Sequence, residues 1–190
     1  MKPEEKARVK IDQWLTEAGW KVINRDEFEA DSSAVAVREG LLKGNREADY
    51  FLFINGKAVG ILEAKREEID ANKGVVCDQV EAYARGVPSF YTAYQKPIPF
   101  LYTSNGKQHY FHDFRQKDSD YEEIFVMHKP KKLVEMLGIE DPFAGLPTLN
   151  PKGLRACQYE AINGLEKSFR NGQNRALMVL ATGAGKTYTA

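Results

Sequence analysis

The stretch from Ala48 to Lys65 most constrains what this chain can fold into. Two apolar runs flank Asn55-Gly56, a dipeptide that strongly favours a β-hairpin. Apolar side chains occupy both parities, with Phe51, Phe53, Val59 and Ile61 on one and Tyr50, Leu52, Ile54 and Leu62 on the other. Because strands with two apolar faces lie inside a sheet that helices cover, this stretch predicts the centre of an α/β domain.

The flanking segments supply further helices and strands. Apolar spacing predicts helices at 3–18, 73–85, 130–137 and 154–169. Short strands are expected at 22–23, 34–37, 90–94, 100–103, 108–112 and 176–180. The predicted fold class is therefore α/β, with a mixed central β-sheet flanked by helices.

A Pro/Gly-rich stretch divides the chain. Pro142, Gly145, Pro147, Pro151 and Gly153 mark residues 140–153 as a linker. The predicted domains are residues 1–139 and, beyond this linker, residues 154–190.

Composition supports a folded protein with an uneven charge. The hydrophobic content of 43%, with 10 Phe and 9 Tyr, is sufficient for a packed core. Residues 1–127 hold 18 basic and 22 acidic residues, net −4, whereas residues 128–190 hold 9 and 5, net +4. Since non-specific DNA binding comes mainly from Lys and Arg, the first segment by itself is expected to bind duplex DNA weakly.

Nothing in the sequence indicates a membrane or secretion. The amino end is charged and no run approaches about 18 apolar residues. Cys77 and Cys157 are expected to be reduced packing thiols of a cytoplasmic protein, since neither has metal-ligand spacing. His109, His112 and His128 are expected to be structural or surface residues.

Asp49 opens one strand of the hairpin, and Glu63-Ala64-Lys65 closes the other. Charged side chains rarely lie on a buried strand without a partner or an ion. A strict two-residue turn would pair Asp49 with Leu62 and send the two carboxylates to opposite faces of the sheet. One extra residue, in a bulge or in a three-residue turn such as 54–56, would restore a shared face, and this is the expected arrangement.

Two carboxylates on one face suit Mg²⁺, with Asp49 and Glu63 as ligands and the Ala64 carbonyl as a third protein oxygen. Such an ion lowers the pKa of bound water and stabilises charge on a phosphate. Lys65 is expected to orient the water or stabilise the transition state. The alternative is a structural ion-pair cluster of the same side chains.

Residues 181–187 read Ala-Thr-Gly-Ala-Gly-Lys-Thr. Gly183 and Gly185 would let backbone amides approach phosphate, Lys186 would meet the β- and γ-phosphates, and Thr187 could ligate magnesium. The pattern predicts an ATP site. Because the chain ends three residues after Thr187, ATP binding and hydrolysis are expected only in a longer protein, and the loop is expected to be frayed or held by packing of Leu177 and Val179.

The acids and Lys65 resemble the PD-(D/E)xK nuclease superfamily, with Ala48 where the family often has Pro. Residues 79–83 read Gln-Val-Glu-Ala-Tyr, which matches the Gln-x-x-x-Tyr motif of the RecB-like branch. The resemblance implies that Gln79 and Tyr83 hold the DNA strand or the polar network of the site. The alternative is that Tyr83 packs in the core and Gln79 is incidental.

Residues 181–187 are similar to motif I of superfamily 2 helicases and translocases. Residues 154–161 resemble their adenine-reading Q motif, with Arg155 and Gln158 in the relevant places. A nuclease followed by such a motor resembles the R subunit of a type I restriction enzyme. Residues 99–106 are also similar to a stretch that follows the nuclease core in that family.

That resemblance implies a PD-(D/E)xK restriction-endonuclease-like fold that cleaves unmodified double-stranded DNA after ATP-driven translocation. It also implies partners, namely methylation and specificity subunits. Two alternatives stay open. One is a type III-like or other helicase-nuclease fusion, and the other is a catalytically inactive DNA-binding or assembly module.

Overall fold

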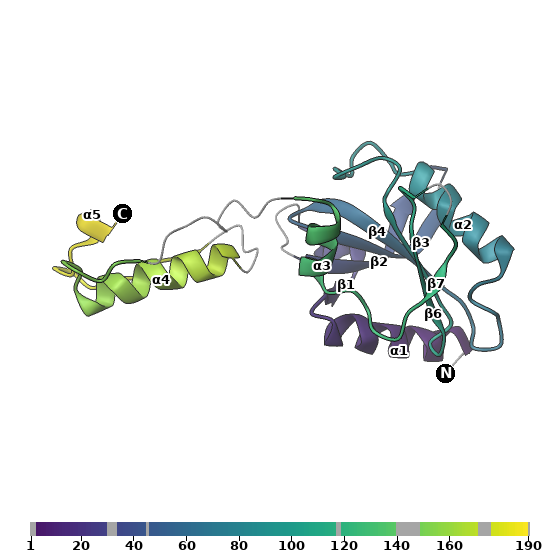
Figure 1. Cartoon of the computed structure of the whole chain (residues 1–190), viewed down its shortest axis with the longest axis horizontal. Helices are drawn as coiled ribbons and strands as arrows, with labels where there is room; N and C mark the ends of the chain where they lie inside the picture. The colour runs from purple at the N-terminus through teal and green to yellow at the C-terminus, as the bar shows by residue number, and fades with distance from the viewer. Residues whose placement is uncertain are drawn as a thin grey trace. The chain divides into compact units, whose positions relative to one another are not determined.

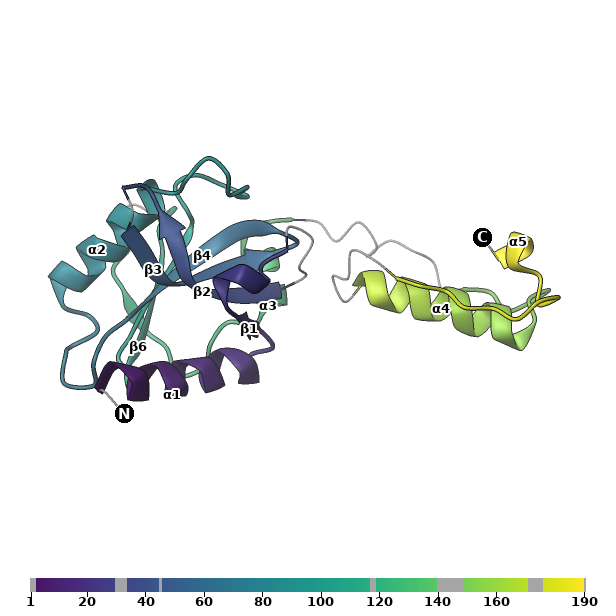
Figure 2. The ribbon, with the colours of Figure 1, turned by 180° about the vertical axis from the view of Figure 1, so that it is seen from behind.

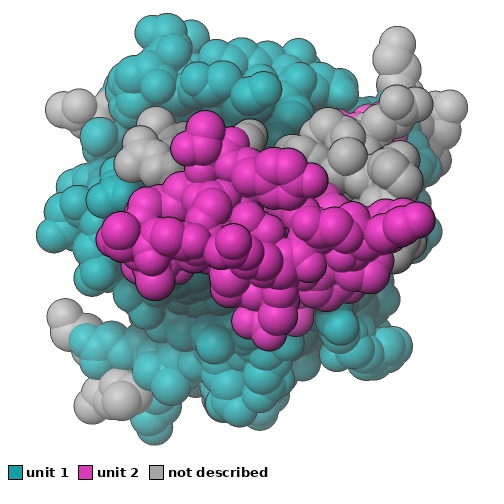
Figure 3. Space-filling view, turned by 90° about the vertical axis from the view of Figure 1, so that its left-hand side faces the viewer, with its two compact units in different colours: residues 1–133 teal, residues 134–190 magenta. Residues whose placement is uncertain are grey.

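A computed structural model of the chain describes residues 3–29, 34–44, 46–116, 119–139, 149–170 and 176–189. The chain forms two compact units, Met1–Leu133 and Val134–Ala190, which Figure 3 colours separately. Among the described residues, the first unit holds a β-sheet with its helices, and the part of the second unit from residue 149 onward holds two helices and a glycine-rich loop. The predicted linker at 140–153 falls largely outside the described residues, so the predicted domain limits stay a prediction.

Among the described residues of the first unit, seven strands form one mixed sheet in sequential order from β1 to β7. The strands are β1 Lys21–Ile23, β2 Ala34–Leu42, β3 Arg46–Ile54, β4 Lys57–Ala64, β5 Phe100–Ser104, β6 His109–Asp113 and β7 Glu122–Glu123. The β1–β2 and β4–β5 pairs are parallel, and the other neighbours are antiparallel. The predicted mixed α/β class is therefore confirmed.

Helices cover both faces of this sheet (Figures 1 and 2). Helix α1 spans Pro3–Glu17, α2 spans Gly74–Arg85 and α3 spans Pro130–Met136, and a short 3-10 turn, η1, spans Arg25–Glu27. Val80 and Tyr83 of α2 pack in the same core as Phe51 and Phe53 of β3. On the other face, the Tyr50 hydroxyl donates to Asp12 of α1 at 2.8 Å. The two apolar parities of the hairpin thus meet different helices.

The register of β3 and β4 carries the extra residue on which the acidic site depends. Ile54 pairs with Lys57, so the turn is the two-residue Asn55-Gly56, with φ of 50° and 70°. The three-residue turn is therefore not used. Instead the register shifts so that Leu52 pairs with Gly60 and Tyr50 with Leu62, which leaves Val59 as a bulge. Continuing this register places Asp49 opposite Glu63 on one face.

Two of the predicted strands are wrong. Residues 90–94 form only an isolated bridge, Ala58 to Ala93, while the Tyr91 side chain packs in the core. Residues 176–180 are not a strand, and Leu177 and Val179 are 87% and 83% exposed. A β-strand requires a neighbour to pair its backbone, and none of the described strands pairs with 176–180. The other strands are found, β2 is longer than expected, and β7 was not predicted.

The second unit contains α4, Ala156–Arg170, and α5, Lys186–Thr189. Both cysteines are free. Cys77 in α2 is half-buried, but Cys157 in α4 is exposed, so the prediction that both are packing thiols is wrong for Cys157. A helical pattern shows which residues share a face but not whether another element covers that face. Among the described residues, no helix has the length and apolar character to cross a membrane.

Candidate active site

The end of the hairpin and the facing helix α2 bring the predicted nuclease residues together. Asp49 lies in β3, Glu63 and Ala64 end β4, and Lys65 follows immediately. A pocket of about 370 Å³ is lined by Arg8, Asp49, Glu63, Ala64, Lys65, Arg66 and Ile69. All residues of the predicted metal and catalytic set therefore line one pocket. Asp49 and Glu63 reach it together because the Val59 bulge puts them on one face.

Glu63 and Lys65 are held by a hydrogen-bond network from α2. Lys65 Nζ donates to Glu63 Oε1 at 2.6 Å and to Gln79 Oε1 at 3.0 Å. Gln79 Nε2 donates to the same Glu63 oxygen at 2.8 Å and to the Tyr83 hydroxyl at 2.6 Å. The four-residue spacing puts Gln79 and Tyr83 on one helical face. Gln79 is thus part of the polar network of the pocket, and Tyr83 both packs in the core and accepts its hydrogen bond.

Asp49 is held through both carboxylate oxygens. Its Oδ2 accepts the Ala64 N–H at 2.8 Å, which ties β3 to the end of β4. Its Oδ1 accepts from Arg8 Nη2 of helix α1 at 2.5 Å. The Asp49 side chain is 15% exposed and that of Glu63 is 5% exposed, so both acids are poorly hydrated.

The surroundings of Glu63 oppose ionisation of its carboxyl group. Burial, and after it the negative charge of Asp49, raise the pKa of the Glu63 carboxyl, while the neighbouring Lys65 lowers it. Desolvation and a like charge both oppose the ionised form. A divalent cation between the two carboxylates would relieve both effects.

The residues present fit a magnesium ion better than a softer metal. Within the described ranges, no three His, Cys, Asp or Glu side chains cluster as a metal site. The protein ligands would be the Asp49 and Glu63 carboxylates with the Ala64 carbonyl, and Mg²⁺ commonly takes one or two carboxylates and retains several waters. An open pocket lined by oxygen donors matches that preference.

Sequence reasoning missed Arg8, Arg66 and Ile69. Arg8 lies on a charged helix, where a basic residue normally faces solvent, and it reaches the pocket only because α1 packs against the sheet. No local pattern distinguishes it from Lys6 or Lys10. Arg66 follows Lys65 directly and could have been included from its position next to the Glu-x-Lys triplet.

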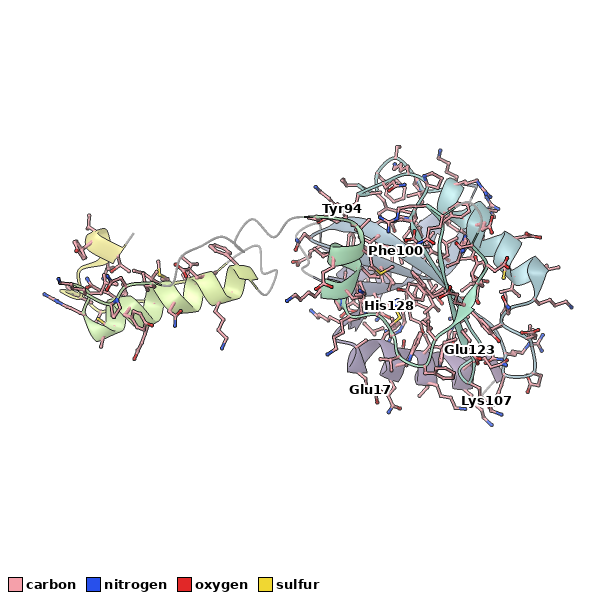
Figure 4. All side chains as sticks on the ribbon, in the orientation of Figure 1. Glu17, Tyr94, Phe100, Lys107, Glu123 and His128 are labelled. Atoms are coloured by element: carbon pink, nitrogen blue, oxygen red, sulfur yellow. The ribbon has the colours of Figure 1, made fainter. Side chains whose placement is uncertain are left out.

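The three histidines have packing contacts in this unit. His109 stacks on Trp14 of α1, with ring centroids 3.9 Å apart, and His112 stacks on Tyr121 at 4.9 Å. His128, labelled in Figure 4, shares a hydrogen bond of 2.9 Å with the Tyr102 hydroxyl. None of the three lines the pocket.

In the second unit, the Q-like residues contact the glycine-rich loop. Arg155 Nη1 donates to the Gly183 carbonyl at 2.8 Å, and Gln158 Nε2 donates to the Ala184 carbonyl at 3.0 Å. Gly183 and Gly185 have φ of 80° and 81°, a region that glycine adopts readily. The Arg155 and Gln158 bonds hold the loop, so the expectation that Leu177 and Val179 pack against it is wrong.

Lys186 and Thr187 begin the short helix α5 directly after Gly185. Lys186 Nζ donates to the carbonyls of Leu180 and Ala181 at 3.0 and 3.3 Å. Lys186 therefore bonds the loop itself in this state. A bound nucleotide would have to replace those bonds with phosphate oxygens.

Comparison with known proteins gives matches in both units of the chain. The family model for the N terminus of type I restriction enzyme R proteins matches residues 35–120, and that for the res subunit of type III restriction enzymes matches residues 151–190. The endonuclease subunit of type I restriction enzyme EcoKI from Escherichia coli (strain K12) is 29% identical, with 98% of this chain and 20% of that protein covered. The EcoAI endonuclease subunit from Escherichia coli is also 29% identical, covering 93% and 23%.

A solved fragment assigned to the HsdR subunit of a type I restriction enzyme from Vibrio vulnificus YJ016 is 23% identical. It has a TM-score of 0.45 and covers 100% of this chain and 36% of that chain.

The matches indicate the class: the chain is similar to the endonuclease subunits of restriction systems, and residues 151–190 match a helicase-like segment of such proteins. More specifically, residues 35–120 match the amino-terminal region of type I restriction enzyme R proteins, and the similarity to the curated type I endonuclease subunits extends over nearly the whole chain. It spans about a fifth of the length of the curated relatives, with 20% and 23% covered.

Proposed function

We propose that residues 1–139 form a PD-(D/E)xK nuclease domain that cleaves phosphodiester bonds of unmodified double-stranded DNA. The observation that carries the proposal is the convergence of Asp49, Glu63 and Lys65 in one pocket, with Gln79 bonded to both Glu63 and Lys65. An ion-pair cluster would satisfy the three charges equally well. The open pocket beside two poorly hydrated carboxylates favours a site that receives an ion and a substrate phosphate.

In this proposal, Asp49, Glu63 and the Ala64 carbonyl hold Mg²⁺, which when bound supplies a more acidic water and charge stabilisation at the phosphate. Lys65 lies beside Glu63 and orients the attacking water or stabilises negative charge that develops on the phosphate. Gln79 keeps the Lys65 ammonium in position through its 3.0 Å hydrogen bond. Tyr83 fixes Gln79 from the next turn of the helix.

The ATP site, the motor and the partner subunits of the proposed enzyme are inferred from the family resemblance. Arg155, Gln158, Gly183, Gly185, Lys186 and Thr187 are proposed to bind ATP in the full-length protein. That protein would translocate DNA with a motor domain and assemble with methylation and specificity subunits in the cytoplasm. The match of residues 151–190 to the res subunit of type III restriction enzymes and the contacts of Arg155 and Gln158 with the loop support this part of the proposal.

The test uses the full-length subunit in its restriction complex. Asp49→Asn, Glu63→Gln and Lys65→Ala should each lower DNA cleavage by at least about a hundredfold, because each removes a group that acts on the phosphate or its ion. ATP hydrolysis and translocation should stay close to those of the unmodified protein. Equal loss of ATPase activity in all three variants would show instead that the cluster is structural.

A further inference from the structure

The guanidinium of Arg8 joins two carboxylates at the rim of the pocket. Arg8 Nη2 contacts Asp49 Oδ1 at 2.5 Å, and Arg8 Nη1 contacts Glu39 Oε1 at 3.1 Å. The side chains differ in exposure: Asp49 is 15% exposed, Arg8 39% and Glu39 55%. Arg8 therefore links a partly buried acid of the proposed metal site to an acid near solvent.

The sheet explains why these acids lie together. In the β2–β3 ladder, Arg38 pairs with Tyr50 and Gly40 with Ala48, so Glu39 lies between these pairs at the level of Asp49. Glu39 has φ of 53°, which non-glycine residues rarely adopt, and it interrupts the regular pairing. With Glu63 opposite Asp49 on the next strand, three acids occupy one level of β2, β3 and β4.

Arg8 and a metal ion would compete for Asp49. The Oδ1 atom accepts from Arg8 and Oδ2 accepts from Ala64 N–H, so an ion that takes Oδ1 would meet the guanidinium at short range. Two cations at that distance repel one another, the more so where water is scarce. Metal binding at Asp49 Oδ1 would therefore favour displacement of Arg8 to another anion.

Two other anions could pair with the Arg8 guanidinium. Glu39 already holds one of its nitrogens and lies nearer to solvent. A DNA phosphate is the second, because a guanidinium matches phosphate with two parallel hydrogen bonds. Arg8 and Arg66 both line the pocket that the scissile phosphate would enter, so such a phosphate would come within reach of Arg8.

We propose that Arg8 is an exchangeable counter-cation of the nuclease site, which neutralises Asp49 in the metal-free state and transfers to a DNA phosphate when substrate enters. Arg8 is a positioning residue in this scheme. In this scheme metal and DNA bind cooperatively, so the metal ion occupies the site mainly when DNA is present. This inference rests on the proposed function of Asp49 and Glu63.

The experiment is a calorimetric titration of the 190-residue chain with Mn²⁺ as the probe ion, with and without a short phosphorothioate duplex that resists cleavage. Without DNA, Arg8→Gln should bind Mn²⁺ roughly fivefold or more tightly than the unmodified chain, the lower end of typical coupling between sites. Duplex DNA should raise the affinity of the unmodified chain by a similar factor and that of Arg8→Gln much less. Lys10→Gln is the matched control, because Lys10 lies on the same helix and pairs with Glu67 instead; its affinity should stay within about twofold of the unmodified chain.

Thermal unfolding supplies a readout that does not depend on nuclease activity. Without metal, Arg8→Gln should unfold at a lower temperature than the unmodified chain, because Asp49 then lies beside Glu63 with no guanidinium. Saturating Mn²⁺ should abolish this difference in unfolding temperature, whereas a purely structural role of Arg8 would leave the difference unchanged. Arg8→Lys, which keeps the charge but not the fork, should fall between the two.

The outcomes separate this inference from the proposed function. If Asp49→Asn abolishes Mn²⁺ binding but Arg8→Gln binds no more tightly than the unmodified chain, the counter-cation role is overturned and the nuclease site stands. If the unmodified chain binds no Mn²⁺, or binds it equally without Asp49, the proposed metal site fails and the role of Arg8 fails with it.

Discussion

Two neighbouring donors converge on a single oxygen of Glu63. Lys65 Nζ and Gln79 Nε2 both bond Oε1, at 2.6 and 2.8 Å, and Gln79 Oε1 accepts from Lys65 in turn. These bonds restrict the side chains that a nuclease reaction would use. Restricting a reactive group in advance reduces the ordering required when substrate binds.

Gln79→Ala should therefore reduce DNA cleavage by the full-length subunit by about 10- to 100-fold, the usual effect of losing a residue that orients the reacting groups. Lys65 would lose an acceptor and Glu63 a donor. Tyr83→Phe is the matched comparison: it removes only the acceptor of the 2.6 Å bond from Gln79, so its loss should be below about tenfold. Cleavage rates would be measured beside ATPase rates, and a larger loss in Tyr83→Phe than in Gln79→Ala would contradict this order of roles.

At the scale of elements, the central strands pack too closely for side chains to be added freely. An ideal Cβ at Gly60 of β4 would lie 3.0 Å from the Phe100 carbonyl oxygen of β5 and 3.1 Å from Leu52 Cδ1. The backbone oxygen cannot move without disturbing the parallel β4–β5 pair, which continues to Glu63 and Ala64. The close approach of these strands thus supports the end of β4 that carries the site.

Gly60→Ala should lower the free energy of unfolding by about 1–3 kcal/mol, as overpacked core positions do. Gly74→Ala at the first residue of α2 is the control, since no atom lies within 4 Å of its added Cβ. That variant should be neutral or stabilising by up to about 1 kcal/mol. Urea denaturation of both variants measures the difference, and equal stabilities would show that β5 shifts without cost.

The contact between α1 and β6 predicts a pH dependence of stability. His109 stacks on Trp14 and its Nδ1 shares a 2.8 Å hydrogen bond with Ser104 Oγ, and burial lowers the pKa of His109 to about 4. In the unfolded chain the pKa is about 6.5. As the pH falls from 6.5 to 4, the unfolded state binds the proton first, so His109 makes the fold progressively less stable and adds no further loss below pH 4.

His109→Phe retains an aromatic ring for Trp14 but cannot titrate. Its free energy of unfolding should therefore fall less than that of the unmodified chain between pH 6.5 and 4. Measurement at pH 8, where His109 is neutral in both states, gives the constant effect of the substitution on packing. Parallel pH profiles for the two proteins would show that His109 does not titrate on unfolding.

At the scale of the whole molecule, charge and chemistry are separated along the sequence. Residues 1–127 contain the pocket of Asp49 and Glu63 and carry net −4, whereas residues 128–190 carry net +4. Affinity for duplex DNA depends mainly on phosphates neutralised by Lys and Arg. This composition supports the proposal that the nuclease domain cuts DNA that another part of the enzyme delivers.

The 190-residue chain should accordingly bind duplex DNA weakly and with a shallow salt dependence. Fluorescence anisotropy at several salt concentrations should give a slope of log K against log salt no steeper than about −3, which corresponds to roughly three phosphate contacts. A Kd of about 10⁻⁸ M or tighter at physiological salt would contradict delivery by a motor.

The sequence by itself determined the strands of the hairpin, the helices at both ends of the first unit, and the set Asp49, Glu63 and Lys65. These follow from local patterns, because alternation, turn residues and capping act over a few neighbouring positions. The shared face of the two acids was predicted to need one extra residue, but only the structure shows that Val59 supplies it as a bulge. The failed strand at 176–180 has the right local composition and no partner strand among the described residues.

Tertiary structure alone decided which side chains complete the pocket. Arg8 and Asp49 are 41 positions apart, and Glu63 and Gln79 are 16 apart. Such contacts depend on where whole helices dock, which is set by the sum of many apolar contacts and not by the residues that meet. The acids of the site can therefore be predicted from the sequence. The arginine that neutralises Asp49 can be identified only from the structure, where α1 packs against the sheet.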